Sequence, residues 1–110
     1  MSAFRIMWIV VMFDLPTQTK KDKKRYRWLS KYLEKESYTR LQYSVYAKVF
    51  SSVESAVHGK KRFREFLKIN IKKGNVRFLM FTDIQFEKME IVIGEPSKQE
   101  EIVQPNLFDF

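Results

Sequence analysis

The chain has 110 residues, no cysteine, and a formal net charge of +8 from 21 lysines and arginines against 13 aspartates and glutamates. This length predicts one domain, and the lack of cysteine excludes disulfides and thiolate metal sites. The N-terminal apolar run is too short to span a membrane and stops at an acid and a proline, unlike a signal peptide, so we expect a cytoplasmic protein with no membrane partner.

Charge is unevenly distributed along the chain. Residues 1–82 carry 19 basic and 6 acidic side chains, whereas residues 83–110 carry 2 and 7. A strongly cationic body attracts polyanions, and nucleic acid is the default candidate, although the charge can also serve solubility alone. We expect one folded domain over residues 1–94, followed by an acidic C-terminal tail over residues 95–110.

The first predicted element is a buried strand made of the eight apolar residues from Ile6 to Phe13. Both alternating sets of its side chains are apolar, so the strand must be covered on both faces. Pro16 lacks a backbone donor and favours an extended residue before it, so the strand ends at about Asp14. The Asp14 carboxylate should therefore lie near solvent at the strand end, facing the basic helix that follows.

A helix is predicted from Thr19 to about Glu36, opened by a capping box of Thr19 and Asp22. Its apolar arc consists of Tyr26, Trp28, Leu29, Tyr32 and Leu33. The opposite arc consists of Lys20, Lys23, Lys24, Arg27, Lys31 and Lys35, with Glu34 as its one acid. Solvated helix faces normally mix signs to form i,i+4 pairs, so this arc favours phosphate contact over mere solvation.

A β-like pattern follows from Tyr38 to Phe50, and its length predicts a break near residues 42–44. A second helix is predicted over roughly residues 53–69, capped by Ser51 with Glu54. Its basic flank adds Lys61 and Arg64 to the candidate nucleic-acid-binding residues.

A turn at Gly74 then leads into a strand from Val76 to Thr82, and another strand is predicted from about Lys88 to Ile93. The order β, α, β, β, α, β indicates a ferredoxin-like α+β domain with an extra C-terminal strand. Two helices cover one face of such a sheet. With no residues left for the other face, we expect a second copy to cover it in a symmetric homodimer.

The strand-end acid has two interpretations. One carboxylate is a poor magnesium site, but two Asp14 side chains across a dimer axis could share a Mg²⁺ ion that keeps several waters and activates one of them. Alternatively, Asp14 caps the backbone of the Pro16 turn. The residues alone leave these readings open.

Several other polar and aromatic residues are assigned structural roles. His58 lacks partners at ligand spacing, so we expect it to be structural or solvent-exposed. Ser44 and Tyr46 lack a nearby base, so we expect packing or dimer contact for them. The aromatics Phe78, Phe81 and Phe86 are assigned to the core or an interface rather than to base stacking. Candidates for backbone contact at sheet edges are Arg5, Arg40 and Arg77.

Five segments together resemble one family, CRISPR-associated protein two, the small ferredoxin-like subunit of the CRISPR adaptation machinery. They are MFDLP at Met12–Pro16, the helix with Tyr26-Arg27, QYSVYAK at Gln42–Lys48, KKGN at Lys72–Asn75 and FTDIQFEKM at Phe81–Met89. Each is weak alone, but their order and spacing over residues 5 to about 93 are specific.

The resemblance implies a homodimer whose sheets face each other, with the last strand of each chain reaching across to the partner. It implies a scaffold for spacer acquisition in antiviral defence, which holds prespacer double-stranded DNA by its backbone and bridges two dimers of the CRISPR integrase. It also implies a magnesium-dependent endonuclease acting on RNA or DNA, with Asp14 as catalytic metal ligand.

Scaffold and nuclease therefore remain alternative functions. A third hypothesis, a single-strand RNA-binding module on the same fold, is disfavoured because such modules display exposed aromatics on the open sheet face. Here the first strand makes that face apolar and mostly aliphatic, as an interface requires.

Overall fold

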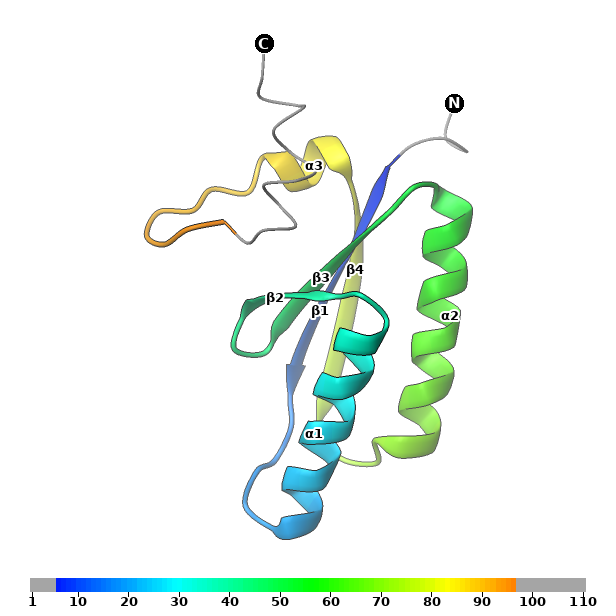
Figure 1. Cartoon of the computed structure of the whole chain (residues 1–110), viewed down its shortest axis with the longest axis vertical. Helices are drawn as coiled ribbons and strands as arrows, with labels where there is room; N and C mark the ends of the chain where they lie inside the picture. Colours follow the sequence, from blue (N-terminus) through cyan, green and yellow to red (C-terminus); the bar gives the residue numbers. More distant parts are fainter. Residues whose placement is uncertain (1–5, 97–110) are drawn as a thin grey trace.

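The computed structural model describes residues 6–96, which form four strands and three helices (Figure 1). In chain order the elements are β1 (Met7–Asp14), α1 (Lys20–Lys35), β2 (Thr39–Gln42), β3 (Val45–Phe50), α2 (Val53–Asn70), β4 (Asn75–Thr82) and α3 (Asp83–Glu87). The strands make one antiparallel sheet in the order β2-β3-β1-β4. The predicted ferredoxin-like α+β fold is confirmed.

Helices α1 and α2 lie side by side on one face of this sheet (Figure 1). Ile9 and Val11 of β1 are completely buried in this layer, as are Leu29 and Leu33 of α1. From α2, Phe63 joins them at 1% exposure. Burying each side chain of this size contributes about 1.5–3 kcal/mol, so this layer holds both helices against the sheet.

Strand β1 lies in the middle of the sheet, with Val10 opposite Ala47 of β3 and Leu79 of β4. Because side chains alternate across a strand, Trp8, Val10 and Met12 face away from the two long helices. Trp8 is 1% exposed there, whereas Val10 and Met12 are only half-buried. The prediction of a strand apolar on both faces is confirmed, but the cover on the second face is incomplete within one chain.

The predicted strand from Lys88 to Ile93 is wrong for the described chain, because residues 83–87 form α3 and residues 88–96 form neither helix nor strand. The side-chain oxygen of Thr82 accepts a hydrogen bond from the backbone N–H of Gln85 at 3.0 Å. The Gln85 side chain accepts one from the N–H of Thr82 at 2.9 Å. This reciprocal cap starts α3 directly after β4, ahead of the residues that were predicted to form the strand.

Part of the second sheet face is covered by the chain itself, which corrects the expectation that no residues remain to cover it. Phe86 of α3 is 4% exposed and packs on Trp8 and Ala47. Residues 89–95 continue over the same face, where they line a groove of about 480 Å³ with Val10, Leu41, Gln42 and Val45. Leu79 of β4 stays 51% exposed.

The start of α1 is as predicted, and the start of α2 is shifted by one residue. Thr19 caps α1 through Asp22, which confirms the first capping box. For α2 the Ser51–Glu54 assignment is wrong, because Ser52 is the cap and its side chain accepts the N–H of Ser55 at 3.1 Å. Serines occupy both candidate positions, so the motif alone does not distinguish the two frames.

The predicted chain reversals occur where expected. Tyr43 and Ser44 separate β2 from β3, with an irregular register between Arg40 and Gln42. Gly74 has φ of +97°, and a Cβ there would lie 2.8 Å from the carbonyl oxygen of Asp14. A glycine is therefore required for β4 to begin directly beside the end of β1.

Two predictions lie outside the described residues: Arg5, and all but the first two residues of the acidic tail at 95–110. Within residues 6–96, no helix is long and apolar enough to cross a membrane.

Candidate nucleic-acid interface

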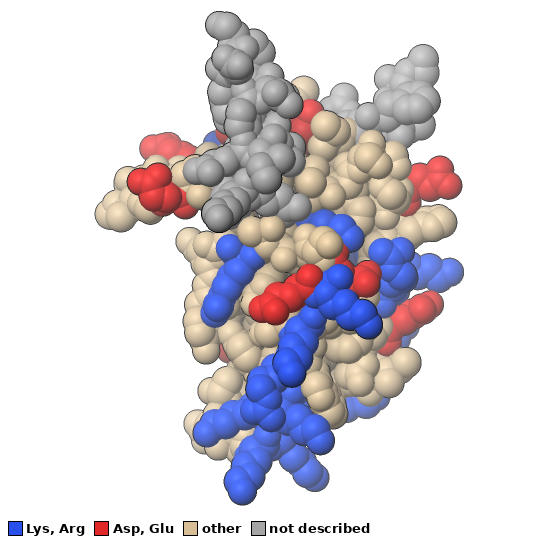
Figure 2. Space-filling model, in the orientation of Figure 1, with Lys and Arg blue, Asp and Glu red and all other residues tan. Residues whose placement is uncertain are grey.

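The outer surface of α1 carries almost entirely positive charge. Figure 2 shows lysine and arginine side chains gathered at the lower end of the molecule, over the N-terminal half of α1. The α1 basic arc, as we name it, consists of the exposed residues Lys20, Lys21, Lys23, Lys24, Arg27, Lys31 and Lys35. None of them forms an ion pair with another residue of the described chain. All five α1 residues predicted to bind nucleic acid belong to this arc.

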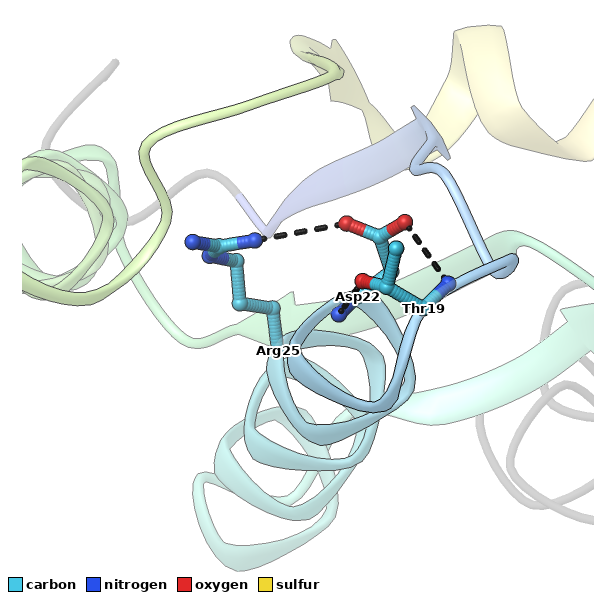
Figure 3. A network of polar contacts seen from close by, with 3 residues as sticks. All are labelled: Thr19, Asp22 and Arg25. Carbon is cyan, nitrogen blue, oxygen red and sulfur yellow. Dashed lines mark hydrogen bonds and ion pairs between the residues drawn. The ribbon is translucent and has the colours of Figure 1, made fainter.

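Asp22, which lies between Lys21 and Lys23 in the sequence, caps α1 and does not lie among the exposed cations (Figure 3). Its side chain is 7% exposed; Oδ2 accepts a hydrogen bond from the N–H of Thr19 at 3.1 Å, and Oδ1 accepts one from Nη1 of Arg25 at 3.3 Å. The backbone hydrogen bond from Thr19 is the main cause that lowers the pKa of Asp22. The carboxylate thus caps the helix and leaves Glu34 as the one acid on the side of α1 that carries the α1 basic arc.

The two predicted residues on α2, Lys61 and Arg64, are also exposed, but the structure separates Arg64 from the α1 basic arc. The Arg64 guanidinium lies 5.9 Å from the ring centroid of Phe78 in β4, so it extends toward the β4 edge. The side of α2 that faces α1 instead carries Arg62, which pairs with Glu36 at 3.3 Å. Arg64 therefore belongs to a separate part of the basic surface.

Asp14 lies exposed at the end of β1, as predicted, but it does not face the basic helix. It follows Met12 by two residues, so it belongs to the sheet face turned away from α1 and α2. There it lines a shallow depression of about 360 Å³ with Met12, Phe13, Asn75 and Arg77. The correction follows from strand alternation, which places Asp14 among the residues of the open face.

Arg77 is the basic residue that the structure brings to Asp14. Asn75 lies opposite Asp14 in the sheet register, and its Oδ1 accepts Nε of Arg77 at 2.9 Å. This bond leaves the other guanidinium donors free to approach a ligand. A carboxylate and an oriented guanidinium in one shallow depression are suited to a phosphate group, with or without a cation.

The donor set for magnesium is incomplete in one chain. Within residues 6–96, no group of three or more histidine, cysteine, aspartate or glutamate side chains is placed to hold a metal. Asp14 offers one hard oxygen ligand, and Mg²⁺ usually keeps several waters and binds through one or two carboxylates plus phosphate oxygens. Asp14 therefore fits a magnesium site that is completed by a second copy, by a phosphate or by both.

The structural roles assigned to other candidates agree with the structure. His58 is exposed on α2, and Tyr46 is 2% exposed with its ring 5.9 Å from that of Phe13. The carbonyl of Ser44 accepts the N–H of Phe13 at 3.1 Å. Phe78, Phe81 and Phe86 all pack in the two hydrophobic clusters, although Phe86 does so from a helix.

A contact cluster at the β2–β3 turn has no clear sequence signal. The carbonyl of Tyr43 accepts Oη of Tyr26 at 3.4 Å and Nη2 of Arg40 at 3.1 Å, while the Tyr43 side chain remains 68% exposed. Arg40 therefore anchors the turn to β2, and Tyr26 anchors it to α1.

Trp28 departs from its predicted place in the packing arc of α1. Leu29 and Leu33 of that arc are completely buried, but Trp28 is 41% exposed and lies beside Lys31 at the surface. The assignment of Trp28 to the packing arc is wrong, because the residue lies on the same side of the helix as Lys24, Lys31 and Lys35, and α2 leaves its ring partly uncovered.

A sequence model of the family described as CRISPR associated protein Cas2 matches residues 7–89, from the start of β1 past the end of α3. The chain belongs to the Cas2 family. The predicted resemblance is thereby confirmed.

Individual Cas2 relatives agree with this assignment. The CRISPR-associated endoribonuclease Cas2 of Parvibaculum lavamentivorans is 39% identical over 89 residues, which cover 81% of this chain and 85% of that protein. The protein of the same name from Ligilactobacillus salivarius is 36% identical over 93 residues, with 84% and 89% covered. A solved structure described as a crystal structure of cas2 superimposes with a TM-score of 0.56 at 19% identity, covering 84% and 92%, and supports the fold alone.

Proposed function

We propose that this Cas2-family chain is a structural subunit of CRISPR spacer acquisition in the cytoplasm. In this proposal a symmetric homodimer binds prespacer duplex DNA by its backbone and bridges two dimers of the CRISPR integrase. The α1 basic arc is the observation that carries the proposal. Its residues are exposed and form no ion pairs within the described chain. Such cations suit sequence-independent contact with phosphates.

The open part of the second sheet face supports the homodimer. Val10 and Met12 are half-buried, Leu79 is 51% exposed, and the nearby Val92 and Ile93 are 80% and 93% exposed. Contiguous exposed apolar side chains of this kind mark an interaction surface. A second copy with the same surface would bury the exposed apolar side chains of both chains at once, as in a two-fold interface.

A metal-dependent endonuclease is the second candidate function, and the presence of Asp14 and Arg77 in one depression favours it. Relatives are named CRISPR-associated endoribonuclease Cas2, which supports hydrolysis of phosphodiester bonds in RNA as the activity. In this reading Arg77 binds and orients a phosphate, while Asp14 holds Mg²⁺. The bound ion would supply an activated water and neutralise developing negative charge.

The scaffold proposal is tested by size-exclusion chromatography with light scattering on the full-length chain. Three samples are compared: the chain alone, the chain with random-sequence duplex DNA, and the chain co-expressed with its integrase and loaded with duplex. We expect a dimer, a dimer with bound duplex, and one dimer joined to two integrase dimers.

The experiment can contradict the homodimer, the DNA binding and the bridging of integrase dimers independently of one another. A monomer at micromolar concentration contradicts the homodimer. Elution of free duplex at low salt contradicts DNA binding. A complex of integrase and duplex that excludes this chain contradicts bridging.

A further inference from the structure

A shallow groove runs between α1 and α2 on the outside of the helical layer. It is lined by Trp28, Lys31, Tyr32 and Lys35 from α1 and by Phe66 and Asn70 from α2, and its volume is about 270 Å³. The rings of Tyr32 and Phe66 stack with centroids 4.1 Å apart and planes inclined by 15°. The groove is therefore lined by a stacked aromatic pair together with the partly exposed ring of Trp28.

The cations around this groove all come from one stripe of α1. Lys24, Trp28, Lys31 and Lys35 follow each other at spacings of four, three and four residues, which places them on the same side of a helix. The Nζ atom of Lys24 lies 5.1 Å from the ring centroid of Trp28. Glu36, near the C-terminal end of α1, is paired with Arg62 at 3.3 Å. The surroundings of the exposed indole are thus predominantly cationic.

We propose that this groove binds an unpaired nucleotide of a nucleic-acid strand, with its base stacked on Trp28 and its phosphates held by Lys24, Lys31 and Lys35. The inference rests on the proposed DNA-binding function, because the same helix carries the duplex contacts. Proteins that bind single strands combine an aromatic platform with a positively charged track in this way. A base inside a duplex has no free face to offer, so the groove selects strand ends, flaps or single strands.

The contact between Lys24 and Trp28 does not oppose this binding. A cation over an exposed aromatic ring is a weak interaction, and stacking of a base on the same ring is stronger. Lys24 has a flexible side chain that can leave the ring and reach an adjacent phosphate. The same residue then contributes a phosphate contact in the bound state.

Tryptophan fluorescence provides a direct test, because the chain has two tryptophans, and Trp8 is 1% exposed whereas Trp28 is 41% exposed. The full-length protein is titrated with oligothymidylate, oligouridylate and a blunt duplex of equal length. We expect quenching by the single strands, and the two oligonucleotides distinguish a DNA ligand from an RNA ligand.

Two variants sharpen this test. Trp28→Ala should remove the quenching and weaken single-strand binding between about five-fold and a hundred-fold, the range expected for one lost base stack. Its affinity for blunt duplex, measured by anisotropy of labelled DNA, should change by less than about two-fold, because no base of a closed duplex reaches the groove. Trp28→Phe keeps an aromatic platform and should retain most of the single-strand affinity.

Unchanged single-strand binding by Trp28→Ala overturns the proposal, and the groove would then be a candidate surface for a protein partner. An equal loss for single strands and blunt duplex also overturns it. A failure of the proposed duplex-binding function can be distinguished from a failure of the groove proposal, because the parent protein itself would then not bind blunt duplex. Selective quenching of Trp28 by single strands would still support the groove.

Discussion

The rings of Trp8 and Phe86 stack almost parallel, with centroids 3.9 Å apart and planes inclined by 6°. Trp8 belongs to the central strand β1 and Phe86 to α3, which directly follows the neighbouring strand β4. This contact closes the sheet face around Trp8. The face around Val10 and Leu79 stays partly open, so one chain covers only part of this second face.

Phe86→Ala should destabilise the folded chain by about 3–5 kcal/mol, because it removes a buried ring and leaves a cavity over Trp8. Urea denaturation followed by tryptophan fluorescence measures the free energy of unfolding. Ile84→Ala is the matched control, since Ile84 lies on the same helix and is 53% exposed, and its effect should stay within about 0.5 kcal/mol. Equal stability of the two variants would contradict the role given to α3.

Leu79→Glu should produce a folded monomer, because Leu79 is 51% exposed within one chain but lies on the face assigned to the second copy. Light scattering gives the mass and circular dichroism checks the fold. Val57→Glu places the same charge on a residue of α2 that is 46% exposed, and this control should remain dimeric. Trp8→Glu should instead unfold the chain, since Trp8 is buried before any partner binds. A dimeric Leu79→Glu protein would place the interface elsewhere.

Replacing Lys20, Lys23, Lys24 and Arg27 together by alanine should weaken binding to random duplex DNA. The slope of log affinity against log salt should fall by about 0.9 for each phosphate contact that is lost. Filter binding or anisotropy across a salt series measures both quantities. A control with the three lysines changed to arginine keeps the charge and should keep the slope. Parental affinity and slope in the alanine variant would exclude the α1 basic arc as the duplex site.

Asp14→Asn should abolish magnesium-dependent cleavage of RNA or DNA while leaving the dimer, duplex binding and integrase-dependent spacer insertion largely intact. The substitution removes a hard oxygen ligand but scarcely changes side-chain volume. Cleavage of labelled oligonucleotides is measured with and without Mg²⁺, and Asp83→Asn in α3 serves as the matched control.

The two possible failures of the Asp14 prediction have different meanings. Cleavage at the parental rate would show that the activity uses other residues. Loss of spacer insertion with normal duplex binding would show that the strand-end site is needed for adaptation, which would reverse the order of the scaffold and nuclease proposals.

Tyr38→Phe should raise the free energy of unfolding by about 1 kcal/mol at neutral pH. The Tyr38 hydroxyl is buried and has no hydrogen-bond partner among the described residues. Its removal therefore eliminates a desolvation cost that no hydrogen bond offsets. Chemical denaturation measures the change. Tyr43→Phe, at a ring that is 68% exposed, should be neutral. A destabilised Tyr38→Phe protein would reveal a partner for the hydroxyl.

Tyr38→Phe should also change how the free energy of unfolding depends on pH above pH 10. Burial raises the pKa of Tyr38 above the ordinary value of 10.0. The unfolded chain therefore loses this proton first, and the contribution of the neutral phenol is complete below pH 10 and declines above it. The advantage of Tyr38→Phe should grow above pH 10. Burial lowers the pKa of Lys48, so the contribution of Lys48 to stability rises with pH. This contribution is the same in the parent protein and in Tyr38→Phe, so it cancels in the comparison.

Local signals in the sequence were sufficient for most of the secondary structure. The Thr19 capping box, the stop at Pro16 and the turn at Gly74 depend on residues that are close together in the chain, so neighbouring residues alone predicted them. The order of strands and helices followed, and with it the ferredoxin-like fold. The arc of lysines on α1 is likewise a property of one helix and could be read from its period.

Contacts between distant segments decided the remaining features. Strand alternation and register placed Asp14 beside Arg77 on the open face, and no local pattern links these two residues. The stack of Phe86 on Trp8 holds α3 against the second sheet face, and the position of α2 leaves Trp28 exposed. The sequence alone therefore determined which side chains each element presents. Only tertiary packing decided which of those side chains are covered and which meet, because burial depends on surfaces that come together when the chain folds.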